Sequence, residues 1–289
     1  MKIHLVDGTY ELFRNYFGAP PKKTRDGREI GATLGLLRSL VALLTRPEVT
    51  HIACAFDHVI ESFRNDLFPG YKTSAGIDPD LLAQFPLAEE ATAALGVVVW
   101  PMVEFEADDA LAAAAAKFQN APSVEQIVLC SPDKDMTQLV TGSRIVCWDR
   151  RRDLVLDAAG VVEKFGVQPH SIPDWLALVG DAADGYPGIP GWGAKSASAV
   201  LSRHAHLESI PDDPRQFGLG LGRAARLAES LTTHRAEAIL YRQLATLRKD
   251  VPLPEKLEEL EWRGARRRLK ELCDAWGEGS LPKRISRWR

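Results

Sequence analysis

Three short apolar runs in this chain each end at or near an aspartate, and this pattern limits the folds open to it. The runs and their acids are Ile3 to Val6 with Asp7, Ile52 to Phe56 with Asp57, and Ile127 to Cys130 with Asp133. Between them, residues 36–44 and 81–95 carry apolar side chains three and four positions apart, as amphipathic helices do. Strands that alternate with helices predict an α/β fold with a mostly parallel sheet, right-handed crossovers and flanking helices.

These acids are expected to meet at one edge of the sheet, because parallel sheets bind ligands beyond the carboxyl ends of their strands. A fourth expected strand, Val97 to Trp100, leads into the acid-rich residues 104–109 and an alanine-rich helix at 110–118. A single aspartate after a strand is usually a turn or cap residue, but its repetition at four strand ends favours a shared site. The candidate ligands are Asp7, Asp57, Glu106, Asp108, Asp109, Asp133, Asp135, Asp181 and Asp184.

Carboxylates crowded in this way need a counter-charge, since like charges repel and raise one another's pKa. Hard divalent cations such as Mg²⁺ accept carboxylate oxygens, and the candidate ligands are numerous enough for two ions that share them. For residues 104–109 taken alone a second interpretation stays open. Acids in a first helical turn also favour the positive end of the helix dipole, and such clusters are usually solvated.

Two loops carry cations that suit a phosphate. Residues 62–76 mix aromatic, cationic, proline and glycine residues without a clear period, and we expect a mobile loop or short-helix excursion there. Its Arg64 and Lys72 either contact a phosphate or face solvent. Residues 18–28 form a second flexible basic insertion.

A glycine- and proline-rich turn at residues 185–193 leads into a helix that is expected to start at Ala194. Such a turn presents free backbone N–H groups at the helix N-terminus, where a phosphate binds well. Lys195 adds a positive charge at the same place. The turn therefore indicates a phosphate-binding element more strongly than a lone glycine-rich loop would.

The composition is that of an ordinary protein with one large or two medium domains. The net charge is −3, yet residues 262–289 alone carry nine cations and three acids, so any nucleic-acid binding depends on local charge. Four cysteines without metal-ligand spacing are expected to be buried, reduced thiols. Neither a signal peptide nor a membrane-length apolar run is present, so a cytoplasmic protein is expected.

Together these motifs resemble the bacterial 5′-nuclease family, which comprises the 5′→3′ exonuclease domain of DNA polymerase I and its stand-alone and phage flap-endonuclease relatives. The matching motifs are Val6-Asp7-Gly8, Phe56-Asp57, Ser62-Phe63-Arg64 through Tyr71-Lys72, Glu106-Ala107-Asp108-Asp109, Ser131-Pro132-Asp133-Lys134-Asp135 with Gln138-Leu139-Val140, Gly180-Asp181 with Asp184, and Pro187 to Lys195. The resemblance implies a PIN-like nuclease core at residues 1–165 with a helical arch at about 58–78. It also implies a helical DNA-binding region at residues 166–289, of the helix-hairpin-helix (helix-three-turn-helix) type, with its hairpin at 187–197.

The resemblance also implies roles for individual residues. Lys72 and Arg64 correspond to arch cations that contact the scissile phosphate. Two Mg²⁺ ions are implied, with Mn²⁺ as a substitute, and a K⁺ ion is possible at the hairpin. The implied ligands of the first metal are Asp7, Asp57, Glu106 and Asp108, and those of the second are Asp133, Asp135, Asp181 and Asp184, with Asp109 a ligand of either. The implied DNA-binding residues of the hairpin are Gly188, Ile189, Gly191, Gly193, Lys195 and Ser196.

The implied function is structure-specific cleavage of DNA that carries a 5′ flap or 5′ end, by a monomer with a possible polymerase or clamp partner. Two departures from the family pattern concern Ala75, where an arginine is usual, and the Ala183-Asp184-Gly185 run, where Ser-Asp-Asn is usual. No polymerase domain follows, so a stand-alone enzyme is expected. Two alternatives are a structure-specific DNA-binding protein with little or no catalysis and an RNA-directed PIN-type nuclease.

Overall fold

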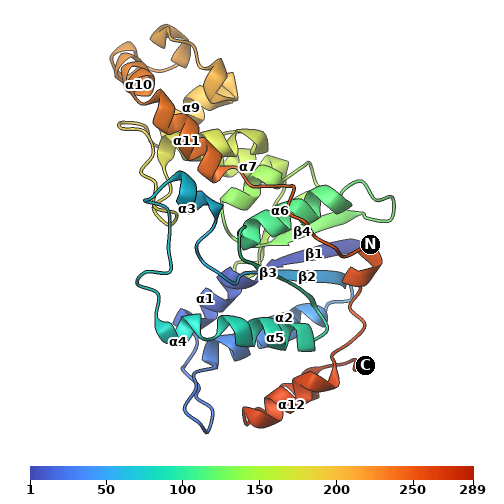
Figure 1. The fold of residues 1–289 in the computed structure, drawn as a ribbon. Helices are drawn as coiled ribbons and strands as arrows, with labels where there is room; N and C mark the ends of the chain where they lie inside the picture. Colours follow the sequence, from blue (N-terminus) through green and yellow to red (C-terminus); the bar gives the residue numbers. More distant parts are fainter. The chain divides into compact units, whose positions relative to one another are not determined.

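The structure is a computed structural model that describes all residues 1–289, and the chain divides into two compact units (Figure 1). Unit 1 comprises Met1–Ile60, Ser74–Ser131 and Lys249–Arg289, and unit 2 comprises Glu61–Thr73 and Pro132–Arg248. The units interleave along the chain, whereas the predicted domain division is a single cut between residues 165 and 166. That boundary stays a prediction.

Unit 1 contains a parallel sheet whose strands follow the order β3-β2-β1-β4. The strands are β1 (Lys2–Asp7), β2 (Val49–Asp57), β3 (Val98–Met102) and β4 (Gln126–Cys130). The predicted parallel α/β arrangement is therefore confirmed. The expected fourth strand starts one residue later than predicted and continues to Met102.

Helices cover both faces of this sheet, and the strand order explains why (Figure 1). The crossovers from β1 to β2 and from β2 to β3 step in one direction, whereas the crossover from β3 to β4 steps back past both strands. Right-handed crossovers therefore place α6 on the face opposite to the other helices. The helices of these crossovers are α1 (Gly8–Gly18), α2 (Gly31–Leu44), α4 (Pro79–Leu82), α5 (Phe85–Ala94) and α6 (Ala107–Phe118).

Two of these helices show how local sequence sets their form. The helix expected at 81–95 is split into α4 and α5, because Pro86 in the first turn of α5 has no N–H to continue a preceding helix. In α6 the alanines from Ala110 to Ala115 are buried, and their small side chains let the helix lie close against the strands. A later helix, α12 (Arg267–Ala275), contacts α5.

Unit 2 is mainly helical. It contains α3 (Phe63–Leu67), α7 (Ala158–Phe165), α8 (Ile172–Val179), α9 (Ala194–His204), α10 (Leu221–Thr233) and α11 (Arg235–Ala245). An antiparallel pair, β5 (Ile145–Asp149) and β6 (Leu154–Leu156), precedes α7. Helix α8 packs against α9 and α11, and the predicted helix at Ala194 is confirmed as α9.

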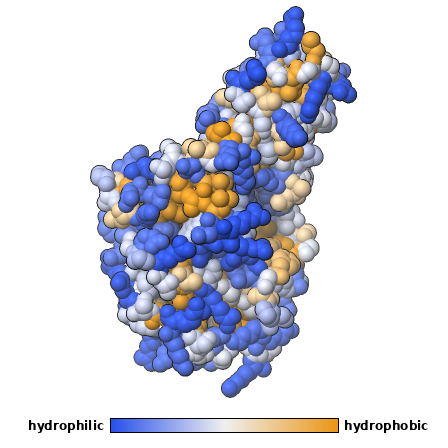
Figure 2. Space-filling view, turned by 180° about the vertical axis from the view of Figure 1, so that it is seen from behind, coloured by the Kyte–Doolittle hydropathy of each residue, from blue (hydrophilic) through white to orange (hydrophobic).

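The surface and the core agree with the composition. The face drawn in Figure 2 is mostly hydrophilic, with apolar residues gathered in a few patches. All four cysteines are buried and form no disulfide, as expected. None of the helices combines the length and apolar character that crossing a bilayer requires.

Candidate metal centre and nucleic-acid interface

Two predicted ligands stand at the carboxyl ends of neighbouring strands in unit 1. Asp7 is the last residue of β1 and Asp57 the last residue of β2, and these strands pair in parallel. Their side chains are almost fully buried, with 5% and 7% of the residue surface exposed. The fold therefore brings both carboxylates to one sheet edge, as the strand pattern predicted.

Backbone and hydroxyl donors fix these two carboxylates. Asp7 caps α1 by accepting from the backbone N of Tyr10 at 2.8 Å, and its other oxygen accepts from the Ser131 hydroxyl at 2.9 Å. Asp57 accepts from the backbone N of Ala107 at 2.6 Å. Ser131 follows β4 and Ala107 begins α6, so four elements meet at this edge.

The acid-rich segment before α6 serves partly as a helix cap. Asp109 is fully buried and its Oδ2 accepts from the backbone N of Glu106 at 3.0 Å. Glu106 is also buried, Asp108 is half-buried and Glu104 is exposed. The Asp109 carboxylate therefore stabilises the first turn of α6. A metal-ligand role stays a prediction for Glu106, Asp108 and Asp109.

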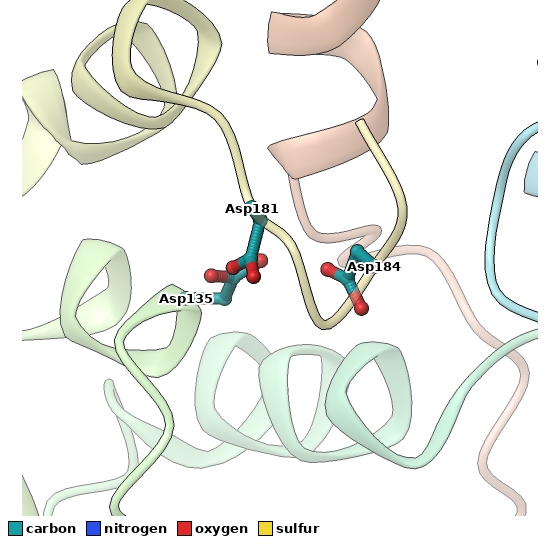
Figure 3. Close-up of side chains that lie close together, drawn as sticks. All are labelled: Asp135, Asp181 and Asp184. Carbon is teal, nitrogen blue, oxygen red and sulfur yellow. The ribbon is translucent and has the colours of Figure 1, made fainter. Parts of the chain in front are cut away.

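In unit 2, three predicted ligands form a compact group. One carboxylate oxygen from each of Asp135, Asp181 and Asp184 lies within 4.8 Å of the others (Figure 3). Asp135 starts a short 3₁₀ helix, Asp135–Leu139, and the other two lie in the loop between α8 and α9. Asp133 supports the group by accepting from the backbone N of Asp135 at 2.9 Å. Residues far apart in sequence thus converge on one volume.

Two glycines close the loop that carries Asp181 and Asp184. Gly180 and Gly188 have φ values of +87° and +73°. A Cβ on Gly180 would lie 2.4 Å from the Pro187 carbonyl carbon, and a Cβ on Gly188 would lie 2.4 Å from the Gly180 backbone N. The backbone N of Asp181 also donates to the Tyr186 carbonyl at 2.9 Å. Only glycine permits both the dihedral angles and this close approach, so the Gly-Asp motif has a structural cause.

The electrostatics of this group suit a divalent cation. Burial, followed by the charges of Asp133, Asp184 and Asp181, raises the pKa of Asp135 well above its ordinary value. Its Oδ1 is buried and lacks a hydrogen-bond partner. A buried, unpartnered carboxylate oxygen that faces two further carboxylates fits a hard cation with oxygen ligands.

Two lysines partly neutralise the group. The Lys134 ammonium forms an ion pair with Asp181 Oδ2, and the Lys72 ammonium lies 3.1 Å from Asp184 Oδ1. The backbone N of Lys72 also donates to the Asp184 carbonyl at 3.0 Å. Sequence reasoning assigned no role to Lys134, although its position between Asp133 and Asp135 was a signal that a cation accompanies these acids.

The structure places Arg64 in a different environment from the one expected of a phosphate-binding cation. Only 1% of its surface is exposed, and its Nε donates to the Leu244 carbonyl at 2.8 Å. A terminal nitrogen donates to the Thr246 carbonyl at 3.3 Å, and the guanidinium lies 4.6 Å from the centre of the Phe63 ring. In this conformation Arg64 joins the α3 segment to α11, and a phosphate contact stays a prediction.

The segment that carries Lys72 also explains one departure from the family pattern. Gly185 has φ +90°, and a Cβ there would lie 2.2 Å from the Gly70 carbonyl oxygen. The absence of a side chain at residue 185 thus permits the 70–72 backbone to lie directly on the loop of Asp184.

The predicted hairpin contains both buried and exposed residues. Ile189 and Ser196 are buried, and the Ser196 hydroxyl bonds with both the N and the carbonyl of Gly193. Gly188 is buried in the close approach described above, while Gly191 and Lys195 are exposed. The hairpin therefore offers backbone groups and the Lys195 ammonium to a ligand, and its two buried side chains hold the turn.

Comparison with known proteins gives a family for both parts of the chain. The description "5′-3′ exonuclease, N-terminal resolvase-like domain" matches residues 2–166, and "5′-3′ exonuclease, C-terminal SAM fold" matches residues 167–268. A 5′-3′ exonuclease of Aquifex aeolicus is 31% identical over 290 residues, which cover 96% of this chain and 97% of that protein. DNA polymerase I of Mycobacterium leprae is 32% identical over 299 residues, but the chain spans only 32% of that relative's length.

Solved structures of low identity share the fold. The T5 flap endonuclease in a complex with DNA and metal ions has a TM-score of 0.67 at 17% identity, covering 98% of this chain and 96% of that one. The catalytic core of Rad2 in complex with DNA substrate has a TM-score of 0.62 at 14% identity, covering 98% and 90%. The fold class is thus confirmed, and the sequence matches along nearly the whole chain show that it belongs to the 5′-3′ exonuclease family.

Proposed function

We propose that this member of the 5′-3′ exonuclease family is a structure-specific 5′ nuclease that hydrolyses DNA phosphodiesters with divalent metal ions. The observation that carries the proposal is the group formed by buried Asp135 and Asp181 with half-buried Asp184, in which one Asp135 oxygen has no hydrogen-bond partner. A protein that only bound DNA would gain nothing from such a group, since it repels phosphates.

Both sets of carboxylates have a place in this proposal. Asp133, Asp135, Asp181 and Asp184 are the ligands proposed for one ion, and Asp7, Asp57, Glu106 and Asp108 those for the other, with Asp109 open to either. Mg²⁺ is the proposed ion because all these donors are hard oxygens, and Mn²⁺ is expected to substitute. Such ions, when bound, would lower the pKa of a coordinated water and would stabilise the attacking and leaving oxygens during hydrolysis.

The chain's own contribution is to hold the ligands and to supply positive charge. Capping and hydroxyl bonds fix Asp7 and Asp57, so that little reordering accompanies metal binding. Lys72 is half-buried beside Asp184, and its ammonium is the cation that we propose for the scissile phosphate. A phosphate contact by Arg64 would require its guanidinium to release the Leu244 and Thr246 carbonyls. Its role in joining α3 to α11 requires no such movement.

Duplex DNA is the proposed partner of the 187–197 hairpin. Exposed Lys195 and the backbone N–H groups before α9 suit a phosphate, and such contacts position DNA without reading its sequence. Backbone carbonyls of the same turn are proposed to hold a K⁺ ion. The T5 flap endonuclease and Rad2 structures each contain DNA, which supports a DNA substrate with a single-stranded 5′ end or flap.

The remaining partners follow from the same substrate. DNA polymerase I relatives contain this region, so a polymerase that leaves 5′ ends, or a clamp, is a reasonable partner in replication or repair. We propose a monomer that acts on cytoplasmic DNA.

The proposal is tested with a 5′-labelled DNA flap on a duplex, incubated with Mg²⁺, with Mn²⁺ or with EDTA. Metal-dependent cuts at or near the junction are expected. The Asp133→Asn, Asp135→Asn double variant is expected to bind the flap but not to cut it, and wild-type cleavage by this variant would refute the site. Tight binding without cutting by the wild type would favour a binding protein, and preferential cutting of a matched RNA flap would favour an RNA-directed nuclease.

A further inference from the structure

Lys134 has a position that the proposed function does not use. It lies between Asp133 and Asp135, and its side chain reaches across to Asp181 on another loop. The Asp181 side chain is only 5% exposed, whereas that of Lys134 is 34% exposed. The Asp181 carboxylate of this ion pair is therefore fixed in the interior, whereas the Lys134 side chain is partly exposed to solvent.

The ammonium is held by several negative charges. The Lys134 ammonium pairs with Asp181 Oδ2, and Asp133 and Asp135 flank Lys134 in the chain. Together with Lys72 on Asp184, it supplies two positive charges to the four carboxylates at residues 133, 135, 181 and 184.

An ammonium neutralises charge but does not bridge the group. Lys134 contacts one oxygen of Asp181, while Asp135 Oδ1 remains buried and unpartnered. A divalent ion held by these acids would take oxygens from several carboxylates. It would therefore compete with the Lys134 ammonium for the Asp181 carboxylate.

We propose that Lys134 is the resident counter-ion of this carboxylate group and that a divalent ion binds by displacing its ammonium from Asp181. The inference rests on the proposed function, because it takes the three acids to be metal ligands. Its half-exposed side chain has room to turn outward once Asp181 is taken. Lys134 is then a positioning residue that keeps the ligands together before the metal arrives.

The opposite role predicts the opposite result. If Lys134 stayed on Asp181 and oriented it as a ligand, removing the lysine would weaken metal binding, since outer groups of that kind strengthen it. If the metal ion displaces Lys134, removing the lysine eliminates its competition for Asp181 and strengthens metal binding.

Calorimetric titration of the full chain with Mn²⁺ separates these roles. Lys134→Met is expected to bind Mn²⁺ about fivefold more tightly than the wild type, which corresponds to about 1 kcal/mol. Lys134→Arg is expected to stay near the wild-type affinity, and Lys164→Met, an exposed lysine of α7 in the same unit, is the charge-matched control. Unchanged or weaker binding by Lys134→Met would overturn the proposal.

A second measurement needs no variant and separates displacement from a through-space charge effect. In the metal-free protein, the side-chain ammonium NMR signal of Lys134 is expected to be protected from exchange, and Mg²⁺ should abolish that protection. Protection that persists at saturating Mg²⁺ would overturn the proposal even if the affinities changed. Asp135→Asn tests the metal site itself, because wild-type Mn²⁺ binding by that variant would refute the proposed function rather than the role of Lys134.

Discussion

At the scale of single residues, some positions in unit 2 have structural roles that their neighbours in the sequence do not indicate. Gly188 illustrates this, because in a turn rich in glycine and proline it looks interchangeable with its neighbours. The structure shows that its positive φ and its approach to Gly180 both exclude a side chain. The loop that carries Asp181 and Asp184 depends on that contact.

Replacing Gly188 tests this dependence. Gly188→Ala is expected to lower the free energy of unfolding by about 2–3 kcal/mol, since it adds both strain at positive φ and a backbone overlap. Gly222→Ala in α10, where no atom lies within 4 Å of the added Cβ, is the matched control and should be neutral or stabilising. Urea unfolding of both variants measures this difference. Equal free energies of unfolding would contradict the structural role of Gly188.

Arg64 is the residue for which burial changes the interpretation most. Its guanidinium spans two backbone carbonyls of the α11 end, a geometry that a lysine ammonium cannot reproduce. Arg64→Lys is expected to lower the free energy of unfolding by about 2 kcal/mol, because a buried acceptor loses its donor. Denaturant unfolding without DNA measures this, and a wild-type midpoint would restore Arg64 to the role of a phosphate contact.

At the scale of elements, a buried carboxylate joins segments that are distant in the chain of unit 1. Glu278, just after α12, accepts from Lys22 at 2.9 Å and from Arg38 of α2 at 2.8 Å. Hydrogen bonds from Ser280 and Lys22 lower its pKa from 4.5 to about 2, although burial opposes the shift. The charged form of Glu278 thus attaches the segment after α12 to the body of unit 1.

This carboxylate predicts a pH dependence of stability. A depressed folded-state pKa gives stability that is present above the ordinary value of 4.5 and is lost as the pH falls toward about 2. Glu278→Gln is therefore expected to cost about 2 kcal/mol at pH 7, reduced from the full linkage value because Lys22 and Arg38 are partly exposed. The difference between variant and wild type should shrink on acidification, as thermal unfolding at several pH values would show.

A control separates this effect from general surface charge. Glu271→Gln removes an exposed acid whose partners, Arg267 and Arg268, are also exposed. It is expected to change stability by less than about 0.5 kcal/mol at any pH. A similar loss in both variants would show that Glu278 holds no special position.

At the scale of the whole molecule, the net charge of −3 gives no general attraction to DNA. Binding must then depend on local cations, and each phosphate contact adds to the salt dependence of affinity. Lys195→Met is expected to weaken binding of a flapped duplex several-fold and to reduce the slope of log K against log salt by about 1. Fluorescence anisotropy at several salt concentrations measures the slope, with Lys256→Met, an exposed lysine of unit 1, as control.

The sequence by itself determined the strand–helix alternation and the positions of Asp7 and Asp57. These depend on local periodicity and on the rule that parallel strands end at one edge, so they can be predicted without long-range contacts. The family resemblance grouped Asp133, Asp135, Asp181 and Asp184, but only the tertiary structure decided that oxygens of Asp135, Asp181 and Asp184 lie within 4.8 Å of one another and that Asp109 caps its own helix. It also decided that Arg64 is buried and that Lys134 pairs with Asp181, because burial and ion pairing arise from packing between segments distant in the chain, and no local pattern encodes them.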